Sequence, residues 1–115
     1  MAQEYLLAFR FTPNAEYQPT EAEQQEQQQL WGAFIGGIAS AGKLVSTNEL
    51  GFEGINVHPD QSTDEGIAVL DNQTLGGYMV ITADSIAEAS ELAKGCPILG
   101  MGGSVEVRNI VPMEH

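Results

Sequence analysis

Two arginines offer the clearest binding chemistry in this chain of 115 residues. Arg10 and Arg108 are its only arginines, and each lies in a stretch with the alternating pattern of a β-strand. A strand arginine can pair with a carboxylate or hold an anion through parallel hydrogen bonds. If the first and last strands are antiparallel neighbours with matched centres, Arg10 lies opposite Glu106, with Arg108 beside Ala8. We therefore expect an Arg10–Glu106 pair, and Arg108, Arg10 and Tyr78 are the candidate ligand-binding residues.

Two further residues could carry acid/base chemistry. His58 titrates near neutral pH and could act as a general base, with Asp60 or Asp71 orienting it. Its alternative is a solvated histidine at a hairpin turn. Asp71 could act as an acid/base group or accept a hydrogen bond from a ligand, whereas the alternative is turn formation, because Asp followed by Asn72 bonds to nearby backbone amides. His58 and Asp71 are thus the candidate catalytic residues.

Other reactive residue types lack the spacing that known chemistries require. Cys96 has no neighbouring histidine and follows a glycine, so we expect a small packed hydrophobe. The glycine-rich stretch 100–103 precedes no helix and is therefore not a phosphate loop. No His/Cys/Asp cluster has metal-ligand spacing, and no nucleophile–base–acid set is visible. The sequence predicts neither a metal nor a cofactor.

Composition restricts the partners and the cell compartment. Sixteen acidic residues against four basic ones give a net charge of −12. Such a surface repels phosphate backbones and anionic lipids, which argues against nucleic acid and membrane partners. One cysteine cannot form an internal disulfide, the start of the chain lacks a basic segment, and no apolar run approaches the ~20 residues of a membrane span. With 43% hydrophobic residues, we expect a single cytoplasmic domain over residues 1–115.

The first half of the chain predicts a strand and a long helix. Residues 5–11 alternate and should form a strand, followed by a loop over 14–18. A helix should begin near Thr20, which forms a capping box with Glu23, and should end at Gly42. The glutamine-rich stretch within it favours a solvent-facing helical segment. The buried stripe of this helix is expected to comprise Leu30, Trp31, Phe34, Ile35, Ile38 and Ala41, with Gly36 and Gly37 packed closely on the sheet.

The second half predicts strands around another helix. Residues 44–53 indicate an extended connection, and 54–58 and 66–70 a hairpin around the turn 59–64. Residues 78–82 are apolar on both faces and predict a central strand. A helix capped by Asp84 or Ser85, where Ser85 would form a capping box with Glu88, should end at Gly95 before a last strand over 104–111.

The resulting order, β-α-β-β-β-α-β, indicates an α+β fold. Two βα units whose helices cover one face predict a ferredoxin-like antiparallel sheet with an extra hairpin strand. The other face of the sheet stays bare and partly apolar, and such a face generally finds a partner. We expect a homodimer that packs through its sheets.

Three segments together resemble one known family. WGAFIGGIASAGKLVSTNEL, LGGYMVITADSIAEASELAKGCP and GGSVEVRNIV are similar in order and spacing to the YCII-related, or DGPF-domain, family. Its members show a Leu-Gly-Gly-aromatic strand, an Ala-rich helix ending in Cys-Pro or Asp-Pro, and a Val-Glu-Val-Arg strand. The resemblance implies a dimeric α/β barrel with a cleft for a small molecule.

The chain departs from this family pattern at two places. Asp71 matches the Asp of the DGPF motif, but the following residues are Asn-Gln-Thr. Some relatives are thought to use a His-Asp pair, whereas this chain has no histidine between Pro13 and Trp31, and Cys96 stands in place of the Asp. The resemblance therefore implies no catalytic pair here.

Three functions remain open from the sequence. The first is binding of a small metabolite, whether anionic, polar or aromatic, in the cleft of a dimeric α/β barrel. The second is a small acid/base enzyme of the lyase, isomerase or dehalogenase type, which requires Asp71 or His58 to face the cleft. The third is a non-catalytic module that docks a basic protein partner in regulation.

Overall fold

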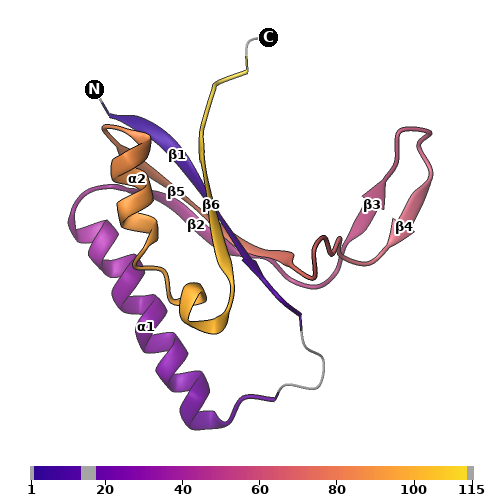
Figure 1. The fold of residues 1–115 in the computed structure, drawn as a ribbon, viewed down its shortest axis with the longest axis horizontal. Helices are drawn as coiled ribbons and strands as arrows, with labels where there is room; N and C mark the ends of the chain where they lie inside the picture. The colour runs from indigo at the N-terminus through magenta and orange to yellow at the C-terminus, as the bar shows by residue number, and fades with distance from the viewer. Residues whose placement is uncertain (1, 14–17, 114–115) are drawn as a thin grey trace.

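Six strands and two α-helices follow one another in a computed structural model that describes residues 2–13 and 18–113 (Figure 1). The expected loop over 14–18 lies almost wholly outside these residues, as does the terminal His115. The elements in chain order are β1 (Gln3–Phe11), α1 (Glu21–Ser40), β2 (Leu44–Glu49), β3 (Ile55–Val57), β4 (Thr63–Glu65), β5 (Thr74–Ala83), α2 (Ile86–Ala93), the short 3₁₀ helix η1 (Pro97–Met101) and β6 (Ser104–Asn109).

Four of the strands form one antiparallel sheet in the order β2-β5-β1-β6. This order, with both helices over one face, confirms the predicted ferredoxin-like α+β architecture. The two longest strands, β1 and β5, occupy the centre, as the apolar pattern of 78–82 predicts. Their pairing slips by one residue after Phe9, because Phe9 faces Gly77 and Arg10 faces Leu75. Gly76 is therefore an extra residue, which forms a bulge at this end of the sheet.

The core lies between the two helices and one face of the sheet. Leu7, Met79 and Ile81 are fully buried there, and Ile38 of α1 and Ala89 of α2 pack against the same cluster. Alternate residues of β1 and β5 point to the opposite, helix-free face, as the period of two requires. The helix-free face is partly apolar, as predicted.

The start and end of α1 match the sequence signals. Thr20 Oγ1 accepts from the Glu23 backbone N–H at 3.1 Å, and the Glu23 side chain accepts in return from the Thr20 N–H at 3.3 Å. Gly42 adopts a φ of 73°, the left-handed value expected after a helix. The glutamine-rich stretch is helical throughout.

Two expectations about the α1 surface are wrong. Leu30 and Ala41 are exposed, so the buried stripe is narrower than the sequence pattern. A Cβ added at Gly36 or Gly37 would meet nothing within 4 Å, so neither glycine marks a close approach to the sheet. The apolar contacts of α1 are made by larger side chains instead.

The cap of α2 forms only in part. Ser85 Oγ accepts from the Glu88 backbone N–H at 3.1 Å. The Glu88 carboxylate does not complete the expected box, because it accepts from Lys43 Nζ at 2.7 Å. This ion pair ties α2 to the start of β2.

The region between residues 44 and 74 differs most from expectation. Residues 44–49, the first part of the expected extended connection 44–53, form the edge strand β2. The hairpin pairs 55–57 with 63–65, inside the stretch expected to be a turn, and 66–70 forms no strand. The hairpin is a separate two-stranded sheet, and Figure 1 shows it projecting away from the main sheet. It exposes Ile55 and Val57.

Two glycines provide a matched test of this packing. We expect Gly36→Ala to stabilise the protein by about 0.5–1 kcal/mol, because the helix gains propensity and the new methyl group meets no atom. Gly103→Ala should destabilise it, because a Cβ there would lie 2.4 Å from the Arg10 carbonyl oxygen. Thermal or urea unfolding measures both. A stable Gly103→Ala protein would contradict the described junction between η1 and β6.

Candidate functional site

A charged cluster lies on the helix-free face of the sheet. Arg10 donates from Nη2 to Glu106 Oε1 at 2.9 Å, and Arg108 donates from Nη1 to Glu106 Oε2 at 3.2 Å. The expected Arg10–Glu106 pair is present, but the register differs by two residues. Ala8 lies opposite Glu106, and Leu6 lies opposite Arg108. A shift of two residues keeps every side chain on the same face, so the pair forms diagonally.

Both arginines act on the same carboxylate. Hydrogen bonds from Arg108 first, and then from Arg10, lower the pKa of Glu106 below its ordinary value. One carboxylate therefore neutralises part of two positive charges. Arg108 keeps 69% of its side chain exposed, which leaves it accessible from the helix-free face.

Tyr78 lies on the same face as the arginines. It stands opposite Ala8 on β1 and Asn48 on β2. Its hydroxyl accepts from Asn48 Nδ2 at 2.8 Å. The structure thus brings the three candidate ligand-binding residues to one face, around Ala8 and Leu6.

The two candidate catalytic residues lie elsewhere. His58 Nε2 is 2.6 Å from Asp64 Oδ2 on the exposed hairpin, so Asp64 is its carboxylate partner rather than Asp60 or Asp71. Asp71 and Asn72 have φ values of 52° and 63° in a two-residue turn closed by Leu70 and Gln73. Positive φ at both central residues is typical of a type I′ hairpin turn. His58 thus lies on a hairpin and Asp71 in a turn, which are the non-catalytic alternatives given for them from the sequence.

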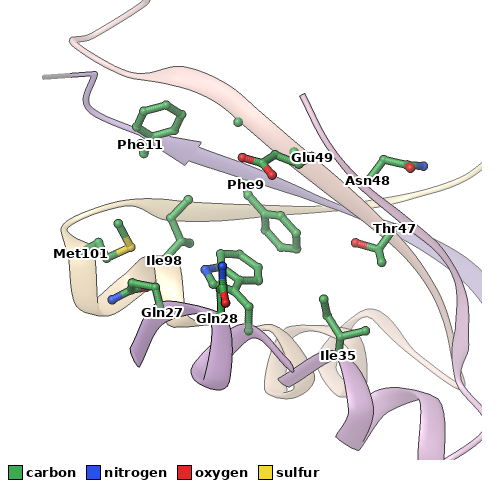
Figure 2. A pocket seen from close by; sticks show the side chains of 13 residues that line it. Phe9, Phe11, Gln27, Gln28, Ile35, Thr47, Asn48, Glu49, Ile98 and Met101 are labelled. Carbon is green, nitrogen blue, oxygen red and sulfur yellow. The ribbon is translucent and has the colours of Figure 1, made fainter. Parts of the chain in front are cut away.

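A cavity of about 490 Å³ lies on the other face, between the N-terminal half of α1 and the sheet. Figure 2 shows Gln27, Gln28 and Ile35 on α1 along one side, and Thr47 and Glu49 of β2 across from them. Most of the lining is apolar. The residues that line it are Phe9, Phe11, Gln27, Gln28, Trp31, Ile35, Thr47, Asn48, Glu49, Gly76, Gly77, Ile98 and Met101.

Two glycines of β5 let aromatic side chains of the cavity lining pack directly on the sheet. Glu49, Gly77 and Phe9 stand in one row across β2, β5 and β1. Gly77 is buried, and a Cβ there would lie 2.9 Å from the Asn48 carbonyl oxygen and 3.6 Å from the Phe9 ring. A Cβ at Gly76 would lie 2.6 Å from the Phe11 ring. The Leu-Gly-Gly segment thus permits the close packing of Phe9 and Phe11 on this side of the cavity.

Aromatic rings form the inner wall. The Phe9 ring contacts Trp31 edge-on at a centroid distance of 5.3 Å, and Phe34 packs behind both at 6.4 and 6.1 Å. These edge-to-face contacts hold the rings in fixed orientations. The wall is therefore preformed for an apolar ligand.

Two acceptors stand against this apolar wall. Gln27 Oε1 is buried and accepts no hydrogen bond from the described residues. An unpaired buried acceptor costs about 1–3 kcal/mol. The Glu49 carboxylate is exposed at the cavity rim. Of the two groups, the Glu49 carboxylate is the one that is accessible from the cavity.

The described structure gives neither Cys96 nor the His, Cys, Asp and Glu side chains a further reactive or metal-binding arrangement. Cys96 is 3% exposed, and burial raises the pKa of its thiol, so it is the packed hydrophobe that the sequence predicts. Within residues 2–13 and 18–113, no three His, Cys, Asp or Glu side chains gather as metal ligands. Neither of the described α-helices has the length and apolarity to cross a bilayer.

The family model of the YCII-related domain matches residues 4–114. The chain belongs to the YCII-related family. This match confirms the resemblance that the Leu-Gly-Gly, Cys-Pro and Val-Glu-Val-Arg segments suggested. No curated protein matches the sequence. The YCII-related fold therefore rests on the family model and on the sheet order, and the function must be argued from the site.

Sequence reasoning did not identify the cavity of this YCII-related protein. The sequence pattern predicts that Trp31 belongs to the core and that Gln27 is a solvent-facing helical residue. It places Glu49 in a connection. The single usable signal is the glycine pair 76–77 inside an apolar strand, since an interior glycine pair often marks a bulge or a close approach.

The charged cluster predicts a pH-dependent loss of stability. Because the pKa of Glu106 is lower in the folded protein, its contribution is present above its ordinary value of 4.5 and is lost as the pH falls through the lowered value. We expect Glu106→Gln to lower the melting temperature at pH 7, with the difference from the parent shrinking below pH 4.5. Glu65→Gln, on the exposed strand β4, is the control. A difference that persists unchanged at about pH 3 would contradict the assignment.

Proposed function

We propose that this YCII-related protein binds a small, mainly apolar molecule in the cavity between α1 and the sheet. The observation that carries the proposal is a preformed space of about 490 Å³ walled by Phe9 and Trp31. Ligand pockets typically measure ~300–1,000 Å³, with apolar and aromatic walls and a few polar groups. The walls, the size and the two unpaired acceptors all fit that description.

This proposal places the ligand on the opposite face of the sheet from the arginines. Arg10 and Arg108 point to the helix-free face and bond to Glu106. The lining of the cavity contains no lysine or arginine. An anionic ligand would therefore meet no positive charge there, and the geometry favours a neutral or cationic one.

The acid/base enzyme has less support. Neither His58 nor Asp71 lines the cavity, and Glu49 is the one acidic residue among those that do. The regulatory interaction module rests on the acidic surface alone. Binding without catalysis is the function that the described geometry supports best.

We also propose that the protein is a homodimer through the helix-free sheet face. Leu6, Val80 and Tyr78 lie together there and are only partly buried in the single chain. Packing two such faces would cover these side chains. It would also bring Arg108 of each chain close to the other, acidic chain. In this arrangement, Arg10, Arg108 and Tyr78 contribute to the interface.

Ligand binding can be located with chemical shifts. We expect titration with indole to perturb the amide resonances of Gly76, Gly77 and Thr47 in ¹H–¹⁵N spectra, because these residues line the cavity. Resonances of the hairpin, such as that of Asn56, should not change. Shifts confined to other regions, or no shifts at millimolar indole, would contradict the proposal.

A matched pair of substitutions controls for stability. Ile35→Phe adds a ring to the cavity wall and should weaken indole binding. Ile86→Phe makes the same change at the exposed first residue of α2 and should leave binding unchanged. Equal affinities for the two variants would show that indole binds elsewhere.

The oligomeric state tests the proposed interface. We expect light scattering to give twice the chain mass of 12.3 kDa for the parent protein. Leu6→Glu should yield monomers, because it places a charge in the centre of the helix-free face. Leu30→Glu, on the exposed side of α1, is the control and should remain dimeric. A monomeric parent protein, or a Leu6→Glu dimer, would refute the interface.

A further inference from the structure

We propose that the cavity selects ligands that carry a protonated amine on an aromatic or other apolar body. The inference rests on the proposed function and specifies the ligand class. Two independent features support it: a carboxylate at the rim that pairs with no lysine or arginine, and the aromatic side chains that line the same cavity.

The carboxylate of Glu49 has no lysine or arginine as a partner. The chain has four Lys and Arg residues, and each of them pairs with another carboxylate. Arg10 and Arg108 both bond to Glu106, as described above. Lys43 bonds to Glu88 at 2.7 Å, and Lys94 to Glu91 at 2.7 Å. Within residues 2–13 and 18–113, no lysine or arginine therefore neutralises Glu49.

The position of Glu49 directs this charge at a ligand. It shares a row with Gly77 and Phe9 and lines the same cavity as the Phe9 and Trp31 side chains. In the view of Figure 2, the Glu49 carboxylate lies between Phe11 and Asn48. A cation bound at this rim would touch the carboxylate on one side and aromatic carbon on the other.

The hydrogen-bonding capacity of this group makes the same demand. The Glu49 carboxylate can only accept hydrogen bonds. An ammonium group offers three N–H donors and no acceptor. An anion would instead face Glu49 with a like charge.

The aromatic wall and the overall charge favour cations further. Phe9, Phe11 and Trp31 present rings to the cavity, and a cation within ~6 Å of a ring face is attracted by its quadrupole. The net charge of −12 raises the local concentration of cations and lowers that of anions. These features discriminate by charge, whereas the apolar wall discriminates by shape.

The test uses three ligands with one ring system. Tryptamine carries an ammonium group, tryptophol a neutral hydroxyl group, and indole-3-acetate a carboxylate. We expect tryptamine to bind at least about fivefold more tightly than tryptophol, as an exposed ion pair with a cation–π contact would give. Indole-3-acetate should bind more weakly than tryptophol. Calorimetry measures the affinities, and ¹H–¹⁵N spectra locate the site.

Two variants separate the local carboxylate from the general charge. Glu49→Gln should abolish the preference for tryptamine over tryptophol. Glu65→Gln removes the same charge from the hairpin, outside the cavity lining, and should leave the preference intact. Both positions are exposed, so neither substitution should unfold the protein.

The outcomes separate the inference from the function on which it rests. Equal affinities for the three ligands, or tighter binding of indole-3-acetate, with shifts at Gly76 and Gly77, would overturn the amine preference and leave the binding function standing. A preference for tryptamine that survives Glu49→Gln would overturn the role of Glu49. Absence of shifts at the cavity with all three ligands would overturn both proposals.

Discussion

The antiparallel pairing of β1 with β5 is the constraint on which the rest of the structure depends. It places Leu7 opposite Met79 and Tyr5 opposite Ile81, so that both strands send the same residues into the core. A slip of one residue would exchange the two faces of each strand and expose the core set. The pairing also decides the site, because it aligns Phe9 with Gly77 and inserts Gly76 as a bulge beside Phe11.

The two faces of the sheet consequently differ in chemistry. The helix-free face gathers Arg10, Glu106 and Arg108 into one network, where a carboxylate shared by two guanidinium groups is largely satisfied. The helix-covered face contains the cavity, with the Glu49 carboxylate in its lining. The four lysine and arginine residues pair with other carboxylates, so Glu49 leaves the cavity rim negative. The proposed preference for a cationic ligand rests on this distribution of charge.

The sequence predicts the parts of the fold that depend on local signals. The Thr20–Glu23 capping box, the turn at Gly42 and the alternation of 5–11 need only neighbouring residues, and all three are present. Residues 44–49 carry too few apolar side chains to indicate a strand, and pairing with the edge of β5 orders them nevertheless. The Gly36–Gly37 expectation was wrong because larger side chains of α1 set its distance from the sheet.

The cavity could not be predicted from the sequence, for a physical reason. Its wall combines α1, η1 and three strands, so no single segment contains its pattern. Gly76 and Gly77 let Phe11 and Phe9 pack closely on β5, and Glu49 joins the lining because β2 pairs with β5 in one particular register. The candidate residues chosen by type, Arg108 and His58, are reactive in principle but lie on other surfaces.

A crystal structure of the protein grown with tryptamine would test the central claim most directly. The account predicts density for the indole ring against Phe9 and Trp31, with its ammonium nitrogen within hydrogen-bonding distance of Glu49. An empty cavity at saturating tryptamine, or a ligand seated on the helix-free face beside Arg108, would contradict it.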